Sequence, residues 1–275
     1  MVRTPHTFSQ IQSLRERYHR ALPGKESLIK VINEAEIPEH VYNSNAIENS
    51  TLSLEETEKI LLQIDLDRFV SEREIHEAKN LARVMEYVET KAKEAEISAP
   101  ILLFLHKMLI ANIRDEIAGR FRAGNEWVRV GSHIGADPKN VERLVTDALS
   151  AYHADRESNV VARIARLHLA FESIHPFCDG NGRIGRVLNN YALIREGYVP
   201  INIAFTNRTR YYEAFREHDV KGGTKIMEEI VGRALTNSYH KRLAYLEGKE
   251  IITLNEYAKR RKLSHSGLIN KAHRQ

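Results

Sequence analysis

Twelve consecutive residues, HPFCDGNGRIGR (175–186), combine one histidine, one aspartate, three glycines, one asparagine and two arginines. They follow a run with an apolar helical stripe. Because helix interiors tolerate proline and glycine badly, Pro176, Gly180 and Gly182 mark a loop between two helices. Glycines allow several backbone N–H groups to point into one concavity, and the next helix adds the positive end of its dipole. The stretch therefore predicts an anion-binding site.

The charged residues of this stretch indicate which anion it binds. Arg183 and Arg186 are three apart, on one helical face in or near the first turn, where the helix dipole disfavours cations. Asp179 is the only acid close in sequence to balance them, so an anion is missing, and a di- or triphosphate would supply it. Asp179 beside a phosphate suits Mg²⁺, and His175, with an ordinary pKa of about 6.5, suits a general base. The alternative, a glycine-rich connector with surface ion pairs, leaves this combination of residues unexplained.

Helical periodicity dominates the rest of the chain, with apolar residues at intervals of three and four. The expected helices cover residues 26–37, 54–64, 73–96, 99–113, 139–155, 161–174, 186–197 and 227–247. Ser53 and Glu56 form the pattern of a capping box at the start of the second of these. Residues 125–138 alternate apolar and polar side chains and contain two glycines, which predicts a short β-hairpin. The expected fold class is all-α with one small hairpin.

Length and composition bound the class of protein. The 275 residues, 42% hydrophobic and 28% charged, suit a globular protein with one main domain. We expect an N-terminal helical region (1–95), a helical core (96–238) and a C-terminal helical tail (239–275). The net charge of +4 is too small to demand nucleic acid. A single cysteine, Cys178, and the lack of signal-peptide or membrane-spanning patterns lead us to expect a cytoplasmic protein with no membrane partner.

The stretch 175–186 resembles the signature of the Fic family, His-x-Phe-x-(Asp/Glu)-Gly-Asn-Gly-Arg-x-x-Arg, at every fixed position. Members of that family are mostly helical and commonly transfer AMP from ATP to a protein hydroxyl. The resemblance implies that His175 deprotonates the target hydroxyl, Phe177 anchors the loop in the core and Asp179 binds Mg²⁺. It also implies an anion hole and a phosphate clamp, formed by Gly180, Asn181 and Gly182 and by Arg183 and Arg186 respectively.

The resemblance extends over roughly residues 40–215. Residues 105–122, including Gly119 and Arg122, are similar to the segment that precedes the family's hairpin. The predicted hairpin corresponds to the family's flap, which is thought to align an extended target segment by strand addition. The flap residues implied to bind the target are Glu126, Trp127, Val128, Arg129 and Val130.

The roles of several tyrosines and histidines have more than one interpretation. Tyr211 and Tyr212 lie where the family places aromatic and polar residues around the nucleobase, so they are candidates for that wall. Ordinary helix packing is the equal alternative for both. His106 and His168 lie on apolar helical stripes and are expected in the core, whereas the role of His133, in the flap, is left open.

A second motif, YNSNAIENSTL (42–52), places Ser44 and Glu48 four apart and hence on one helical face, before the helix terminator Asn49. From the residues alone this is a short helix with one carboxylate near its end, which suits solvent exposure. The segment resembles the family's inhibitory motif, (Ser/Thr)-x-x-x-Glu-(Gly/Asn), in the arrangement that lies N-terminal to the catalytic core. The resemblance implies that Glu48 pairs with Arg186 and so leaves ATP in an unproductive pose.

The leading hypothesis is an autoinhibited protein adenylyltransferase that uses ATP and Mg²⁺ and modifies a target protein, with self-modification and a homo-oligomer left open. Some family members that carry the glutamate reverse the modification, so a de-AMPylase or bifunctional enzyme is the nearest alternative. A nucleotide-sensing regulator that binds nucleic acid is a different class, suggested by residues 253–275, which are basic and helix-turn-helix-like. The intact His175 and Asp179 favour the enzyme, because sensing needs no base.

Overall fold

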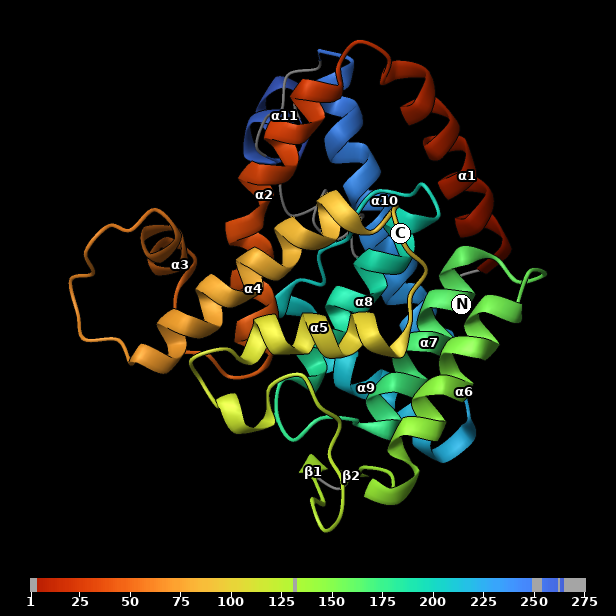
Figure 1. Cartoon of the computed structure of the whole chain (residues 1–275). Coiled ribbons are helices and arrows are strands. Elements are labelled where there is room, and N and C mark those ends of the chain that lie inside the picture. Colours follow the sequence, from red (N-terminus) through yellow and green to blue (C-terminus); the bar gives the residue numbers. More distant parts are fainter. Residues whose placement is uncertain (1–3, 131–132, 249–253, 262, 265–275) are drawn as a thin grey trace.

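The protein is all-α, as the sequence predicts, in a computed structural model that describes residues 4–130, 133–248, 254–261 and 263–264 (Figure 1). Within these residues the only strands form one antiparallel hairpin, β1 (Arg129–Val130) with β2 (His133–Ile134). The helices are α1 (Thr4–Ala21), α2 (Glu26–Ile47), α3 (Leu54–Leu61), α4 (Glu72–Lys91), α5 (Ala99–Ile110), α6 (Val141–Ala154), α7 (Val160–Ile174), α8 (Asn181–Arg195), α9 (Arg208–Lys221), α10 (Lys225–Leu246) and α11 (Leu254–Arg261). Short 3₁₀ turns are η1 (Asp115–Ile117), η2 (Pro138–Asn140) and η3 (Phe205–Asn207).

Helix α8 lies at the centre of the body, where it contacts α2, α4, α5 and α7 (Figure 1). Its residues from Arg183 to Ile194 are all buried, so no face is left for solvent. A helix that is covered on every side is held in place by packing rather than by its own propensity. The N-terminus of α8, which carries the predicted anion site, is therefore fixed by four neighbouring helices.

Helix α2 differs from the sequence-based expectation of a helix over 26–37 followed by a separate short helix. The structure has one helix of 22 residues that runs through Pro38. Proline removes one intrahelical donor, and burial of Val41 and Ile47 on the core compensates for this loss. The helix ends as predicted, because Asn49, just after the C-cap residue Glu48, adopts a left-handed conformation with φ of 70°.

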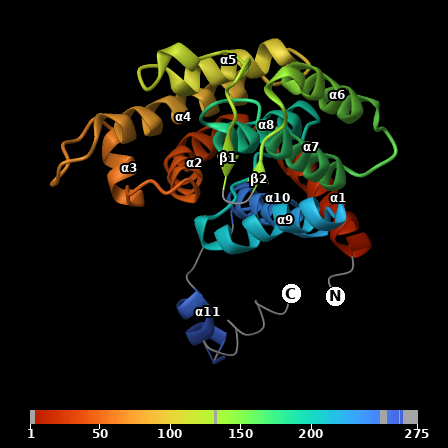
Figure 2. The ribbon, with the colours of Figure 1, turned by 90° about the horizontal axis from the view of Figure 1, so that it is seen from below.

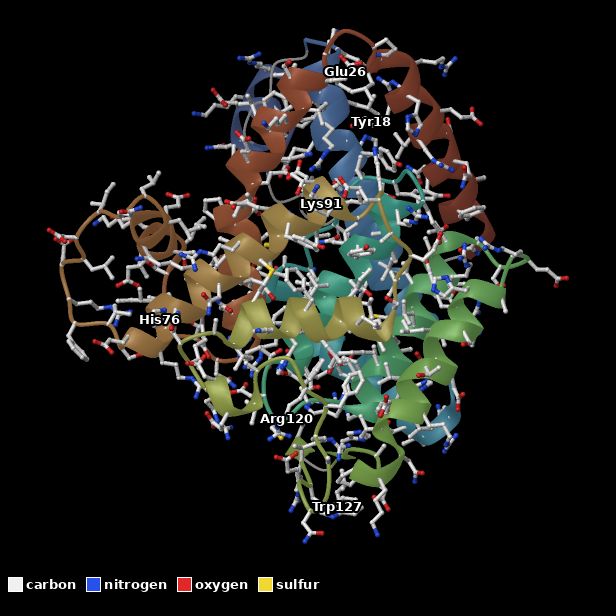
Figure 3. The ribbon with its side chains drawn as sticks, in the orientation of Figure 1. Tyr18, Glu26, His76, Lys91, Arg120 and Trp127 are labelled. Atoms are coloured by element: carbon white, nitrogen blue, oxygen red, sulfur yellow. The ribbon has the colours of Figure 1, made fainter. Side chains whose placement is uncertain are left out.

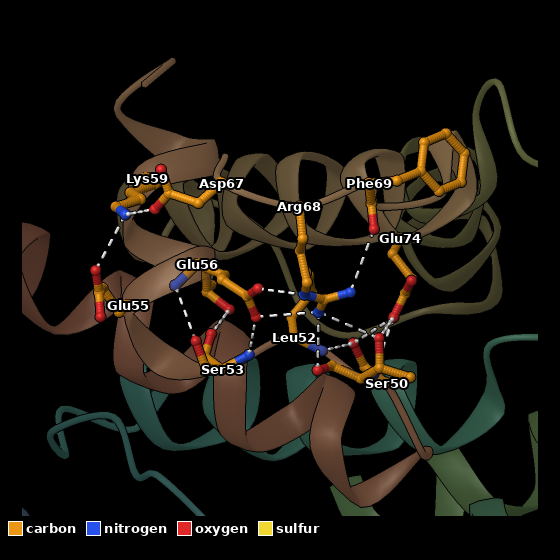
Figure 4. Close-up of polar contacts among 12 residues, drawn as sticks. Ser50, Leu52, Ser53, Glu55, Glu56, Lys59, Asp67, Arg68, Phe69 and Glu74 are labelled. Carbon is orange, nitrogen blue, oxygen red and sulfur yellow. Dashed lines mark hydrogen bonds and ion pairs between the residues drawn. The ribbon is translucent and has the colours of Figure 1, made fainter. Parts of the chain in front are cut away.

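The segment that follows α2 is fixed by a cluster of polar contacts (Figure 4). The predicted capping box is confirmed, because the Ser53 side chain accepts from the Glu56 N–H and the Glu56 carboxylate accepts from the Ser53 N–H. Arg68 donates to both Glu56 and the Thr51 carbonyl, and the Thr51 N–H donates to Glu74 at 2.8 Å. These bonds join the end of α2 to the first turns of α3 and α4.

Helix α1, which was not among the helices expected from the sequence, packs along α10. Its buried residues Ile11, Leu14 and Tyr18 recur at intervals of three and four, and Tyr18 meets Tyr239 edge to face at 5.7 Å (Figures 1 and 3). One apolar cluster consequently includes residues from both ends of the described chain, from Ile11 to Leu246.

The predicted division into three parts stays a prediction, and the boundary after residue 238 falls inside α10. Most of the helix-turn-helix-like tail, 253–275, lies outside the described residues, which include only α11 and residues 263–264 of it; in Figure 2 α11 is drawn below the other helices. No helix among the described residues has the length and apolar character needed to cross a membrane.

A buried ion pair between α10 and α2 gives a test of this packing. Arg242 is 1% exposed and donates to Glu36 at 2.6 Å and to Asn33 at 2.7 Å. We expect Arg242→Met to lower the free energy of unfolding by about 3 kcal/mol, because it leaves the buried Glu36 with Lys241 as its main partner. Urea unfolding measures this loss. Arg143→Met is the control, since its pair with Asp147 is exposed; equal losses for the two variants would contradict the assignment.

Candidate active site between α7 and α8

The loop between α7 and α8 turns sharply at two left-handed residues, His175 with φ of 53° and Gly180 with φ of 79°. Phe177 is fully buried between them and stacks on the ring of His106 at 3.8 Å. The Asn181 side chain closes the loop, because it accepts from the Phe177 N–H and donates to the Phe177 carbonyl, both at 2.8 Å. Phe177 is thus the anchor that the resemblance implies, and the side chain of Asn181 is used to close the loop.

His106 is a core residue, as predicted, and it also supports the loop. Its Nδ1 accepts from the Gly119 N–H at 3.1 Å, so the proton is on Nε2, which donates to the Asp179 carbonyl at 3.1 Å. Burial lowers the pKa of His106 to about 4, which keeps the ring neutral and this bonding pattern fixed. His168 is likewise fully buried, and its Nε2 lies 2.7 Å from the Tyr211 hydroxyl.

Asp179 lies in a ring of alternating charges that reaches α4. Its carboxylate contacts Arg183 at 3.3 Å and Arg73 at 2.7 Å, and Glu77 contacts both of these arginines. Burial favours the neutral acid, yet Arg183 and Arg73 hold the pKa of Asp179 below its usual range, so it is ionised. The sequence motif indicates Asp179 and Arg183 but gives no sign of Arg73 or Glu77, which approach only in the folded chain.

A divalent cation at Asp179 would need ligands from elsewhere. Among the described residues there is no group of three or more side chains that could hold a metal ion. Mg²⁺ commonly binds through one or two carboxylates together with phosphate oxygens and water. The ionised Asp179 at the start of α8 fits that pattern, with the remaining ligands supplied by a nucleotide.

Arg186 is buried and contacts the last turn of α2. It donates from Nε to the Ser44 hydroxyl at 2.9 Å, and from Nη2 to the Ser44 carbonyl at 2.8 Å and to Glu48 at 2.9 Å. The Tyr211 hydroxyl lies 3.3 Å from Nη1. The predicted partners Ser44, Glu48 and Arg186 are therefore brought together, although 138 residues separate Glu48 from Arg186 in the sequence.

Glu48 approaches the first turn of α8 closely because residue 182 is glycine. A Cβ at Gly182 would lie 2.0 Å from Oε1 of Glu48 and 3.1 Å from Nη1 of Arg186. The carboxylate thus lies at the N-terminal end of a helix, where the dipole favours an anion. Its Oε1 lies 2.9 Å from Nη2 of Arg186, so Glu48 occupies one donor of that guanidinium.

His175 is held so that one ring nitrogen is free. Nδ1 lies 3.2 Å from the Glu172 carbonyl, which can only accept, so Nδ1 carries the proton and Nε2 keeps its lone pair. Arg122 donates to the carbonyls of His175 and Ile174, at 2.6 and 2.9 Å, and fixes the backbone there. Burial lowers the pKa of His175 to about 4, which leaves the ring neutral at physiological pH.

A cavity of about 390 Å³ opens beside His175. Residues from the end of α2, the flap, α7 and α9 line it: Asn49, Val130, His133, Glu172, Ser173, His175, Arg208, Tyr212, Phe215, Arg216 and Asp219. Tyr212 belongs to this wall, with Arg208 over its ring at 5.4 Å. Tyr211, by contrast, is 2% exposed and interacts with His168 and Arg186, so it lies in the interior behind the wall.

The flap residues differ in what they present. Glu126 is paired with Arg120 at 2.6 Å, whereas Trp127 is 57% exposed and lies at the end of the flap farthest from the helices (Figure 3). Val128 faces inward, with a methyl group 3.0 Å from where a Cβ of Gly135 would lie. Arg129 pairs with Ile134, and Val130 with His133, in the two-stranded ladder. His133 has its Nε2 3.0 Å from the Ser173 carbonyl and so attaches the flap to α7.

These features define a class of helical proteins in which a glycine-containing loop joins a neutral histidine, at the end of one helix, to the N-terminus of a second helix with two buried arginines. Residues 96–193 match the model of the Fic/DOC family, so this part of the chain is a Fic domain. The chain is similar to the protein adenylyltransferase Fic of Drosophila ananassae and that of Drosophila melanogaster, each 27% identical over 245 residues. The match covers 83% of this chain and 49% of either relative, so the chain spans about half the length of the curated relatives it matches.

Solved structures show the same fold. A Fic domain containing signaling protein from Bacteroides thetaiotaomicron superposes with a TM-score of 0.79 at 24% identity, covering 89% of this chain and 99% of that one. Fic-1 from C. elegans superposes with a TM-score of 0.76 at 24% identity, covering 87% of this chain and 71% of that one. The helical arrangement described above is therefore shared with these proteins.

The contact between Ser44 and Arg186 can be tested by its contribution to stability. We expect Ser44→Ala to lower the free energy of unfolding by about 1 to 3 kcal/mol, because it removes the hydroxyl that accepts from Nε of a buried guanidinium. Thermal and urea unfolding measure the loss. Ser150→Ala, at an exposed position of α6, is the matched control and should change stability by under about 0.5 kcal/mol. A Ser44 variant as stable as the control would show that the contact contributes nothing.

Proposed function

We propose that the protein is an adenylyltransferase that transfers AMP from ATP to a hydroxyl side chain of a target protein. The observation that carries this proposal is His175, a neutral base whose Nε2 is free at a 390 Å³ cavity, directly before a helix N-terminus that holds two buried arginines. The name of the curated relatives supports the same reaction class. The single cysteine, Cys178, supports a reducing, cytoplasmic location.

In this proposal each group of the site has one task. His175 takes the hydroxyl proton of the target while the oxygen attacks the α-phosphorus, the bond to the β-phosphate breaks and pyrophosphate leaves. The backbone N–H groups at the start of α8, with Arg183 and Arg186, bind the phosphates whose charge increases as the bond breaks. Mg²⁺ held by Asp179 would supply further neutralisation of the phosphate charge. Tyr212 borders the nucleotide, and the exposed edge of the flap binds the target segment.

Glu48 inhibits this reaction in the proposal. A charge-assisted bond from Arg186 to a carboxylate uses the same donor that a γ-phosphate requires. The carboxylate also repels phosphates from the first turn of α8. Nucleotide therefore binds without the contact to Arg186 as long as Glu48 remains in place.

His175→Ala, made together with Glu48→Gly, should abolish AMP transfer and leave ATP affinity within about twofold of the parent, because the base acts in the chemical step. Transfer of label from ATP and calorimetric titration of ATP with Mg²⁺ measure the two quantities. Retained transfer would remove His175 from the mechanism, and equal loss of ATP binding would assign it to nucleotide recognition.

Glu48→Gly should raise AMP transfer by at least about tenfold, which corresponds to roughly 1.4 kcal/mol of lost inhibitory coupling. Arg186→Ala in the same chain should cancel the gain, since the freed arginine is the means of activation. Glu94→Gly, an exposed carboxylate in the turn after α4, is the control and should leave transfer unchanged. Unchanged transfer in Glu48→Gly contradicts inhibition; removal of AMP from a labelled target by wild type but not by this variant would then point to the reverse reaction.

A further inference from the structure

Glu172, on the last turn of α7, is a buried carboxyl to which neither the motif nor the proposed mechanism gives a role. Its side chain is 10% exposed, and its Oε1 has no hydrogen-bond partner. Oε1 packs on the backbone of α8, where a Cβ at Gly185 would lie only 2.4 Å away. A buried carboxylate oxygen without a donor is costly, so this group either holds a proton or lacks a partner that another state supplies.

The second oxygen of Glu172 faces the base. Its Oε2 lies 3.7 Å from Nδ1 of His175, and the carbonyl of the same residue accepts the Nδ1 proton at 3.2 Å. Glu172 therefore touches the nitrogen opposite the one that would accept the proton from the target. A negative charge at this point stabilises an imidazolium, and a neutral carboxylic acid does so much less.

The charge of Glu172 depends on its neighbours. Glu48 from α2 disfavours ionisation and Arg186 from α8 favours it. The other titratable or charged groups at this place are Tyr211, Arg208, Arg216 and Asp219 from α9, His133 from the flap, and His168 and His175 from α7 itself. Burial first, and then the charge of Glu48, raise the pKa of Glu172 to about 8, so it is protonated at neutral pH.

The carboxyl groups of Glu48 and Glu172 thus both interact with the single cation Arg186. Glu48 bonds to it directly at 2.9 Å, which leaves Glu172 as the neutral member of the pair. When Glu48 is gone, the uncompensated arginine favours the ionised form of Glu172. The released proton can reach solvent through the cavity that Glu172 lines.

We propose that Glu172 is the positioning residue of His175, and that it loses its proton when Glu48 leaves Arg186, so that release of Glu48 also strengthens the base. The part that concerns AMP transfer rests on the proposed function above. While Glu48 is in place, its charge also raises the pKa of His175. Its departure frees the arginine and replaces this charge with the carboxylate of Glu172, which lies 3.7 Å from Nδ1 and so stabilises the imidazolium of His175 directly.

Infrared spectroscopy tests the proton link without nucleotide or target. A carbonyl band of a protonated carboxylic acid is assigned to Glu172 if it is present in wild type and missing in Glu172→Gln. In wild type this band should disappear on titration with a midpoint near 8, and in Glu48→Gln the midpoint should fall by at least about one pH unit. A midpoint that is the same in both proteins, or no Glu172 band at neutral pH, would overturn the proposal.

Thermal unfolding verifies that Glu172→Gln is folded. It also tests whether the Glu172 proton makes the stability of the wild type depend on pH in the expected direction. The folded state holds the Glu172 proton between its ordinary pKa of 4.5 and about 8, so the wild type loses stability across this range as pH rises. Glu172→Gln should lack this loss, and its unfolding midpoint should exceed that of wild type by a margin that grows with pH. A margin independent of pH would contradict the assigned protonation.

Kinetics in the Glu48→Gly background test the positioning role. Glu172→Gln should lower kcat about tenfold with KM for ATP unchanged, and it should move the acid limb of the pH–rate profile to lower pH, because His175 becomes a weaker base. Glu172→Asp should restore part of the rate. An unmoved limb would overturn the positioning role. If no variant transfers AMP at all, the proposed function fails, and the infrared titration still decides the proton link.

Discussion

The arrangement depends on one constraint, the burial of the Arg186 guanidinium. A buried cation must have anionic or strongly polar partners, because the cost of removing it from water is several kcal/mol. Here Ser44, Glu48 and Tyr211 provide them, from α2 and α9. The last turns of α2 are consequently polar on the face that meets the body, with Asn43, Ser44 and Asn45 all buried. Together with the burial of Val41 and Ile47, this polar contact explains how α2 continues through Pro38 to the site.

The arrangement also depends on the loop between α7 and α8, which brings the end of α7 and the start of α8 close together. The left-handed residues His175 and Gly180 reverse the chain within a few residues, and Phe177, stacked on His106, fixes the turn in the core. His175, the proposed base, then lies at the end of α7, and the proposed anion site lies at the start of α8. The Arg122 guanidinium donates to the backbone carbonyls of Ala136, Ile174 and His175, and so joins the flap to the same turn. The same turn therefore holds the proposed base, the proposed phosphate site and the flap.

The sequence predicts those parts of the site whose cause is local. The left-handed Gly180, the capping box at Ser53 and the helix stop at Asn49 follow from backbone preferences within a few residues. Gly182, which was expected in the loop, lies instead in the first turn of α8, because this helix begins at Asn181 and not at residue 186. The pairing of Glu48 with Arg186 follows only from the resemblance, since no local rule joins segments so far apart. Arg73, Glu77 and Glu172 were missed because their roles depend on packing. The one available signal was that Glu172 precedes His175 by three residues on the same helix face.

In the proposed function, the position of Glu48 makes its contact with Arg186 reversible. Glu48 is the C-cap of α2, where the helix dipole disfavours a carboxylate by about 0.3 to 1 kcal/mol. Its side chain is 36% exposed, so it regains water at little cost when it leaves. Arg186 cannot leave, because it is held in the interior of α8. Under the proposed autoinhibition, the strength of inhibition therefore depends on which other acceptors can bind Arg186, and a phosphate offers several acceptor oxygens where Glu48 offers one.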